Sequence, residues 1–342
     1  MPSFCRHGRL EANCPICSKK QKGGYAPIRP ARRIAEPRQP AAAPAQRQRR
    51  GGAPRAGALH VRRLARAADD GYRHDLVPGV HATADARLLA DELAFSVARL
   101  DELAVRPPGL YAEVAAAGAG GDAAEREEAL WLAFLIAYLS PLEEADPWPG
   151  IAAARVAWAT GELPALAGVP TGPRSAHDPA RGERTVAAYR AWAARAGSQA
   201  AAFAGEPSWE PERRFDRAFE RLALPGFGRA QRYELLTVLG HLGVLAVRPT
   251  SLQLTVEPLD RTVVAAKRAF GIGDAMELRH RVVRLASELD VPVEALDLAL
   301  LNFNRAPNAP RITAGASAHA DPERLALLRD ALGVGEPDDL LA

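Results

Sequence analysis

Apolar residues recur at helical spacing through most of this chain, and alternating apolar and polar residues are almost absent. This pattern constrains the fold more than any other feature, because a spacing of three to four residues buries one face of a helix and does not match the two-residue period of a strand. The pattern begins near Leu59 and predicts an all-α fold. The one strand-like stretch, residues 252–256, is isolated. The predicted helices cover residues 83–95, 123–139, 150–160, 182–196, 210–222, 229–242, 260–270, 274–289, 293–303 and 321–333.

Composition divides the chain into three parts. Residues 1–20 hold all three cysteines, and residues 21–58 are rich in Pro, Ala, Arg, Gln and Gly, which predicts a disordered basic linker. Residues 59–342 carry the helical pattern and are expected to form the folded domain. Residues 1–66 carry 16 Lys and Arg against two Glu, a net charge of +14, while the remaining residues carry −11. A basic segment therefore precedes an acidic body, and the basic segment is expected to attract DNA.

The first seventeen residues contain four side chains of the kind that bind zinc: Cys5, His7, Cys14 and Cys17. Zinc prefers tetrahedral sets of Cys and His, and a Cys-x-x-Cys turn presents two thiolates to one ion. We expect these residues to bind a structural Zn²⁺, since four protein ligands leave no open position for catalysis. A reducible cysteine pair and reactive surface thiols are the alternatives.

The sequence also bears on the location of the protein. Its longest apolar run, Ala129 to Leu139, has eleven residues and is shorter than the roughly 18 residues that span a bilayer. No charged and then apolar signal peptide opens the chain, and the body contains no cysteine. We therefore expect a cytoplasmic protein.

The most informative motif is a run of five residues, Leu224, Pro225, Gly226, Phe227 and Gly228. Two glycines around one apolar residue allow a tight turn between two helices, and its backbone amides can face an anion together with the next helix N-terminus. This arrangement predicts a helix-hairpin-helix that binds a DNA phosphate without reading the base sequence. An ordinary turn between helices is the alternative.

Two carboxylates follow this motif along the chain. Asp260 follows an apolar stretch and opens a helix that ends in Arg-x-Phe-Gly. Asp297 lies further on, in an apolar helix that ends in Asn304 and Arg305. Asp260 is a candidate catalytic residue, although Asp is also a favoured helix N-cap. Asp297 is a weaker candidate because it lies among leucines.

The order of these pieces resembles the helix-hairpin-helix DNA glycosylase superfamily over about residues 200–306. The resemblance implies an all-α, two-lobed helical body that acts on DNA. It also implies that the Asp260 carboxylate stabilises positive charge at the sugar of an extruded base. The residues expected to contact DNA are those of the hairpin motif together with Arg229, Arg232, Asn304 and Arg305.

Members of the superfamily that also cleave the backbone place a lysine two residues after the second hairpin glycine, where this chain has Ala230. The resemblance therefore implies a monofunctional glycosylase, which hydrolyses the N-glycosidic bond and lacks a lysine lyase step. The chain is also similar to the α-glutamyl/putrescinyl thymine pyrophosphorylase branch, which replaces a pyrophosphate on a modified thymine with an amine. A third alternative is a non-catalytic, zinc-containing DNA-binding protein.

One polar cluster precedes the first strong helix. It comprises Asp69, Asp70, Gly71, Tyr72, Arg73 and His74. Such side chains can line a pocket or bind a second metal, and a solvated lead-in to the domain is the alternative.

Overall fold

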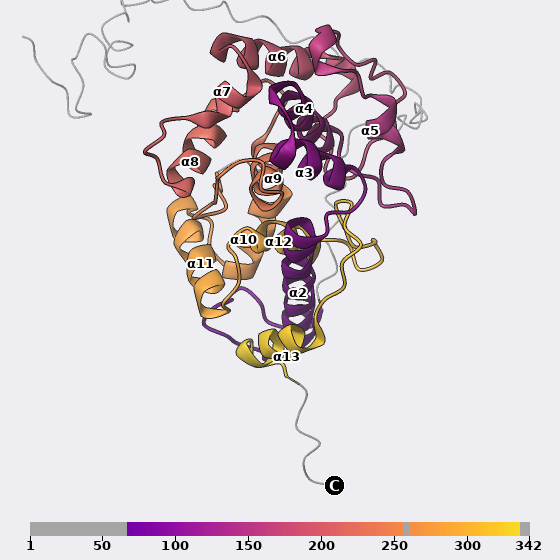
Figure 1. Ribbon diagram of the computed structural model, residues 1–342. Helices are drawn as coiled ribbons and strands as arrows, with labels where there is room; N and C mark the ends of the chain where they lie inside the picture. The colour runs from indigo at the N-terminus through magenta and orange to yellow at the C-terminus, as the bar shows by residue number, and fades with distance from the viewer. Residues whose placement is uncertain (1–66, 256–259, 336–342) are drawn as a thin grey trace, which may run out of the picture. The chain divides into compact units, whose positions relative to one another are not determined.

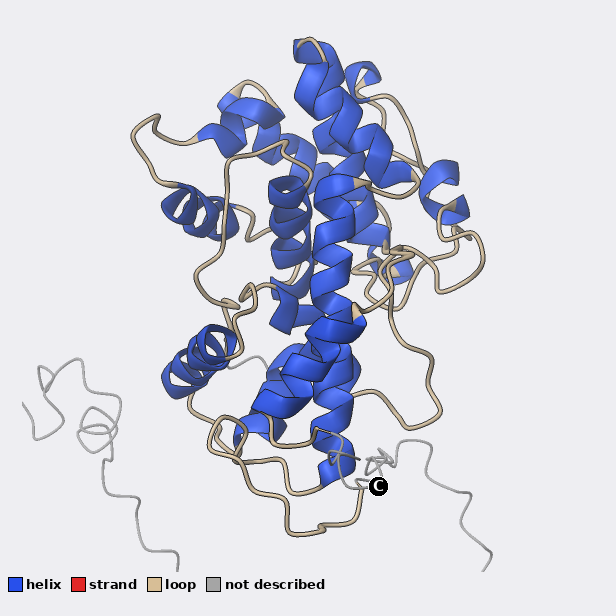
Figure 2. Ribbon diagram, turned by 60° about the horizontal axis from the view of Figure 1, so that its bottom comes forward, coloured by secondary structure: helices blue, strands red, loops and turns tan. Residues whose placement is uncertain are grey.

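The computed structural model describes residues 67–255 and 260–335, which form twelve α-helices, two short 3₁₀ helices and no strand (Figures 1 and 2). The prediction of an all-α fold is confirmed for this part of the chain. The predicted zinc ligands Cys5, His7, Cys14 and Cys17 and the predicted linker 21–58 lie outside the described residues. The elements are α2 (Thr83–Val105), α3 (Leu110–Gly120), α4 (Ala123–Leu139), α5 (Pro149–Ala153), η2 (Trp158–Thr160), η3 (Pro179–Arg181), α6 (Arg184–Ala196), α7 (Gln199–Ala204), α8 (Pro211–Arg221), α9 (Arg229–His241), α10 (Arg261–Phe270), α11 (Ala275–Glu288), α12 (Ala295–Phe303) and α13 (Pro322–Ala331).

Local sequence signals explain where the predicted helices begin and end. The Asp122 carboxylate accepts hydrogen bonds from the first-turn amides of α4, and the Glu125 carboxylate accepts one from the Asp122 amide. These reciprocal bonds form a capping box. The helix ends at Ser140, where Pro141 disfavours another helical residue. α10 ends at Gly271, which has a left-handed φ of 64°.

Three sequence expectations differ from the structure. The helix predicted over 150–160 is divided into α5 and η2. α3 and α7 were not predicted, because α3 consists mostly of Ala and Gly and α7 has only six residues. The described part of the strand-like stretch forms no strand. Leu252 and Leu254 are buried there, and arginine side chains bond to their carbonyl groups in place of a neighbouring strand.

α9 joins two groups of helices (Figure 1). It packs against α4 and α8 of one group and against α2 of the other, which also contains α10, α12 and α13. The resemblance implied a two-lobed body, but the described residues belong to one compact unit. One hydrophobic cluster runs through both groups of helices, from Leu76 to Val334. A second, smaller cluster comprises Phe95, Leu298, Leu301, Ile312 and Ala314.

The polar cluster at residues 69–74 forms hydrogen bonds to the start of α2 and to the residues after α13. The Asp70 carboxylate accepts a hydrogen bond from the Thr83 amide at the start of α2, and the Tyr72 hydroxyl donates to the carbonyl of Leu332 after α13. Within the described ranges, no three His, Cys, Asp or Glu side chains come together as a metal site. The cluster thus has a structural role in the fold. No helix in the described part of the chain combines the length and hydrophobicity that crossing a membrane requires.

Candidate functional site

The turn between α8 and α9 has the geometry expected of a hairpin. Gly226 has a φ of 78°, which L side chains rarely adopt. Phe227 is buried, and its ring lies 5.2 Å from that of Phe134 in α4, so the turn is fixed to the core. Gly228 is the N-cap of α9 and has no side chain to bond to the first-turn amides. The N-terminus of α9 is therefore uncapped.

Asp260 is both a helix cap and a member of an ion pair. Its carboxylate accepts hydrogen bonds from the amides of Thr262 at 2.9 Å and Val263 at 3.2 Å, which caps α10. The same carboxylate forms a two-point ion pair with the Arg229 guanidinium. The capping alternative raised by the sequence is thus observed together with an electrostatic contact. Both contacts fix the direction of the carboxylate.

Arg229 lies in the interior, although the sequence led us to expect a DNA contact there. Its side chain is 0% exposed. Besides Asp260, it donates to the carbonyl of Leu252 at 3.0 Å and to Asp297 Oδ1 at 2.8 Å. Burial alone would lower the pKa of Arg229, but the charges of Asp297 and Asp260 outweigh it and raise the pKa above its usual value. Because its donors face these groups, Arg229 organises the interior and does not face a phosphate.

These contacts extend into a row of alternating charges that we call the ionic chain. Arg174 donates to Asp297 Oδ2 at 2.6 Å and to Glu234 Oε2 at 2.8 Å. Glu234 in turn pairs with Arg99 of α2. The members of the ionic chain, in order, are Arg99, Glu234, Arg174, Asp297, Arg229 and Asp260. Three cations balance three anions, and the chain links α2, α9 and α12 to the start of α10.

Asp297 is held ionised at the centre of this chain. Burial alone would raise the pKa of its carboxyl group, but the charges of Arg229 and Arg174 and their hydrogen bonds lower it below its usual value. Its side chain is only 4% exposed. Asp297 therefore contacts Arg229 and Arg174 from behind, and it does not reach the pocket described next.

A pocket of about 310 Å³ opens where the N-termini of α9 and α10 meet, and we call it the α9/α10 pocket. Asp260 and Arg229 form part of its wall, together with Arg174. No lysine occurs in its described lining. The lining residues are Pro173, Arg174, Ser175, Gly228, Arg229, Ala230, Gln231, Asp260, Arg261, Thr262 and Leu301.

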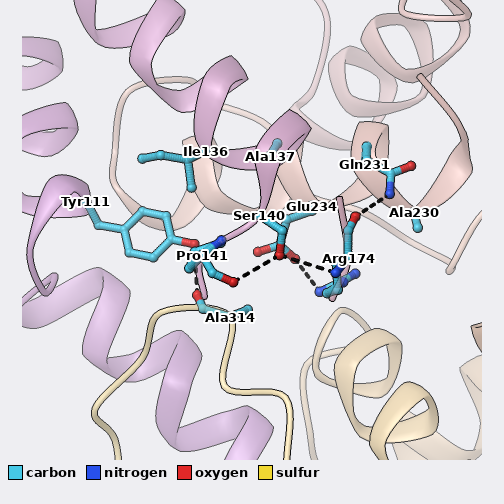
Figure 3. A pocket seen from close by; sticks show the side chains of 10 residues that line it. All are labelled: Tyr111, Ile136, Ala137, Ser140, Pro141, Arg174, Ala230, Gln231, Glu234 and Ala314. Carbon is cyan, nitrogen blue, oxygen red and sulfur yellow. Dashed lines mark hydrogen bonds and ion pairs between the residues drawn. The ribbon is translucent and has the colours of Figure 1, made fainter. Parts of the chain in front are cut away.

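A second, much smaller cavity of about 10 Å³ lies on another side of Arg174 (Figure 3). It has room for about one water molecule. Figure 3 shows Arg174 and Glu234 pointing toward each other on its wall, and Gln231 donating to the Arg174 carbonyl at 2.6 Å. Burial raises the pKa of Tyr111, which also lines the cavity, to about 12. Arg174 is thus held by both its side chain and its backbone.

The remaining predicted DNA contacts lie away from the α9/α10 pocket. Pro225 is exposed and Leu224 is half-buried in the hairpin turn. The Arg232 guanidinium lies over the Phe219 ring at 4.2 Å. Arg305 pairs with the buried Glu92, and Asn304 ends α12. The structure thus brings together Gly228, Arg229, Asp260 and Asp297, and it places Arg232, Asn304 and Arg305 elsewhere.

Sequence reasoning did not identify Arg99, Arg174 or Glu234. Arg99 and Glu234 stand beside apolar residues in α2 and α9, and both side chains become buried. A charge inside an apolar helical run is a signal of a buried ion pair, because an unpaired buried charge is strongly unfavourable. Arg174 offers no comparable signal, since it lies in a Gly- and Pro-rich loop.

Comparison with known proteins gives one match. A family model described as alpha-glutamyl/putrescinyl thymine pyrophosphorylase clade 3 matches residues 174–312, less than half of the chain. The matched range begins at Arg174 and contains every member of the ionic chain except Arg99. The members inside it are Arg174, Arg229, Glu234, Asp260 and Asp297. Neither curated proteins nor solved structures give a significant match.

Proposed function

We propose that this protein modifies thymine in DNA by replacing a pyrophosphate on the base with an amine. The observation that carries this proposal is the family match, because it contains the hairpin, the two carboxylates and every lining residue of the α9/α10 pocket except Pro173. The match favours pyrophosphate displacement over the hydrolysis of the glycosidic bond that the wider resemblance implied. The substrate is then a 5-hydroxymethyl-uracil in DNA that carries a diphosphate on its hydroxymethyl oxygen.

The reaction consists of one bond exchange at the methylene carbon of the base. The bond from this carbon to the diphosphate oxygen breaks, and pyrophosphate leaves with the electron pair. A bond from the same carbon to the amine nitrogen forms, and the nitrogen loses a proton. The N-glycosidic bond is not broken in this exchange, so no abasic site is formed.

Asp260 is the residue that we assign to the amine proton. It carries the carboxylate on the wall of the α9/α10 pocket, and its two amide contacts and the Arg229 ion pair fix its direction. A carboxylate in contact with the attacking nitrogen accepts its proton as the new bond forms. Asp297 acts through Arg229, because it does not line the pocket. Asp297 is accordingly a positioning residue.

We infer that the base is extruded into the pocket, as in other enzymes that do chemistry on a base in DNA. The hairpin supports such access because its second glycine, Gly228, forms the edge of the pocket. Backbone amides of the turn can bind a phosphate of the extruded strand without base specificity. We therefore assign a sequence-independent DNA contact to this turn, next to the pocket that takes one base.

The proposal is tested with a duplex that contains diphosphorylated 5-hydroxymethyl-uracil. We expect the full chain to release pyrophosphate only when an amine is present, and glutamate and putrescine are the first two amines to use. The mass of the product base should increase by the added amine. Abasic sites in place of this product would establish the glycosylase reaction. DNA binding without any product would establish a non-catalytic protein.

A further inference from the structure

The α9/α10 pocket contains three arginines, and two of them are fully engaged. Arg229 donates to two carboxylates and to a backbone carbonyl. Arg174 donates to two other carboxylate oxygens, on Asp297 and Glu234. Since the ionic chain is neutral, neither arginine contributes excess positive charge to the pocket.

Arg261 differs from both. It follows Asp260, lines the same pocket and is exposed, and its side chain forms no ion pair or hydrogen bond with the residues at 67–255 and 260–335. Partial burial and the nearby charge of Arg174 lower the pKa of Arg261. Two guanidinium groups therefore face the same region, and that of Arg261 has no anion beside it among the described residues. Because the ionic chain is neutral as a unit, Arg261 adds one positive charge that no described residue of the pocket balances.

The uncapped start of α9 lies on the same wall. Ala230 and Gln231 of its first turn line the pocket, and the N-cap residue Gly228 provides no side-chain acceptor for their amides. Amides in the first helical turn favour anions. The positive charge of Arg261 and the partial positive charge of these amides thus both favour a negatively charged ligand.

We propose that Arg261 binds the diphosphate of the modified thymine and the pyrophosphate that is released from it. This assignment rests on the function proposed above, and it names the residue that recognises the leaving group. A diphosphate carries several negative charges that one unpaired guanidinium and free amides can stabilise. An amino acid with a carboxylate has the same kind of charge, so the test below separates the two ligands. A diamine would be repelled by Arg261.

The test measures binding of inorganic pyrophosphate to the full chain by calorimetry, in the wild type, Arg261→Gln and Arg261→Lys. Arg284→Gln is the matched control, because Arg284 is exposed on α11 and lies outside the pocket. Loss of one charge-assisted hydrogen bond should weaken binding by about tenfold or more in Arg261→Gln. We expect partial retention in Arg261→Lys and no change in Arg284→Gln. Arg261 has no partner among the described residues, so unfolding temperatures should remain equal.

Failure of this inference and failure of the proposed function give different results. Equal pyrophosphate binding by the wild type and Arg261→Gln would overturn the inference, and so would an absence of binding by the wild type. Glutamate binding that depends on Arg261, without pyrophosphate binding, would also overturn it. Amine-dependent release of pyrophosphate from DNA would then still support the proposed function. Conversely, Arg261-dependent pyrophosphate binding without any turnover on DNA would support the inference and contradict the proposed function.

Discussion

The helices α9 and α10 begin at the same pocket, and only α10 has a side-chain cap at its N-terminus. The first-turn amides of α10 are bonded to the Asp260 carboxylate, which is itself paired with Arg229. The first-turn amides of α9 have no side-chain cap, because Gly228 precedes them. The α10 end is therefore closed by the protein's own anion, while the α9 end is open to an anion from outside. This difference separates the residue to which we assign the amine proton from the surface to which we assign the diphosphate.

The closed end depends most on Arg229, and its removal should have the largest effect. Arg229→Met would leave Asp260 and Asp297 buried without this partner. Loss of one member of a buried ion pair costs about 3 to 5 kcal/mol, so the free energy of unfolding in urea should fall by that amount. The exposed Arg284→Met is the control and should change stability little. A loss below about 1 kcal/mol would mean that the ionic chain does not hold α9, α10 and α12 together.

The open end depends on the turn that places it. In Gly226→Ala the residue would have to keep a φ of 78°, and its new β-carbon would clash with Thr185 Oγ1. Gly243→Ala needs a similar φ of 70° but meets no atom within 4 Å. The backbone strain of about 1 to 2 kcal/mol applies to both variants, so Gly226→Ala should be destabilised further than Gly243→Ala. Equal urea midpoints for the two would show that the turn is not packed against Thr185.

Acid should weaken the closed end selectively. The folded-state pKa of Asp297 is lowered, so its contribution to stability is complete above the unfolded pKa of about 4 and is lost as pH falls through the folded pKa. We expect the free energy of unfolding of the wild type to fall as the pH drops below about 4. The loss should reach at most about 1.4 kcal/mol for each unit by which the unfolded and folded pKa values of Asp297 differ. Asp297→Asn should be less stable at pH 6 and should show a smaller decline. The exposed Asp101→Asn is the control, and an unchanged slope in Asp297→Asn would contradict this prediction.

The smallest expected change in stability comes from closing the open end. Gly228 has φ −74° and ψ −176°, which any residue adopts, and a β-carbon there meets only the flexible Gln231 side chain at 3.3 Å. Gly228→Asp would provide the missing cap and should change stability by only a few tenths of a kcal/mol. Its carboxylate would occupy the anion position, so pyrophosphate affinity should fall. Gly228→Ala separates the added charge from the added carbon atom. Undiminished pyrophosphate binding by Gly228→Asp would show that the open α9 end does not bind the anion.

The sequence predicts the helical part of this comparison well and the electrostatic part poorly. Helix ends follow from local signals, such as the cap at Asp260 and the stop at Gly271, and the observed α10 agrees with them. Arg229 was expected to contact DNA because it follows a hairpin glycine. Its actual partners, Asp260 and Asp297, are 31 and 68 residues away along the chain, and no local pattern specifies such pairings.

The same limit applies to Arg174. It joins Glu234 to Asp297 in the ionic chain only because the loop before η3 folds back onto α9 and α12. The hairpin glycines and the two carboxylates were found from residue type and order, since both are local motifs. The open α9 end and Arg261, which has no side-chain partner among the described residues, required coordinates, because each is defined by what the neighbouring elements do not supply.

Asp260 is assigned to the reaction as well as to the cap of α10, and the turnover of two matched variants separates these two roles. Asp274 caps α11 through the same two kinds of amide bond, and Asn is a good N-cap in both positions. The measurement is the rate of amine-dependent pyrophosphate release from saturating modified DNA by the wild type, Asp260→Asn and Asp274→Asn. We predict a loss of about 10² to 10⁴-fold in Asp260→Asn and a wild-type rate in Asp274→Asn. A wild-type rate in Asp260→Asn would show that Asp260 caps α10 and takes no part in the reaction.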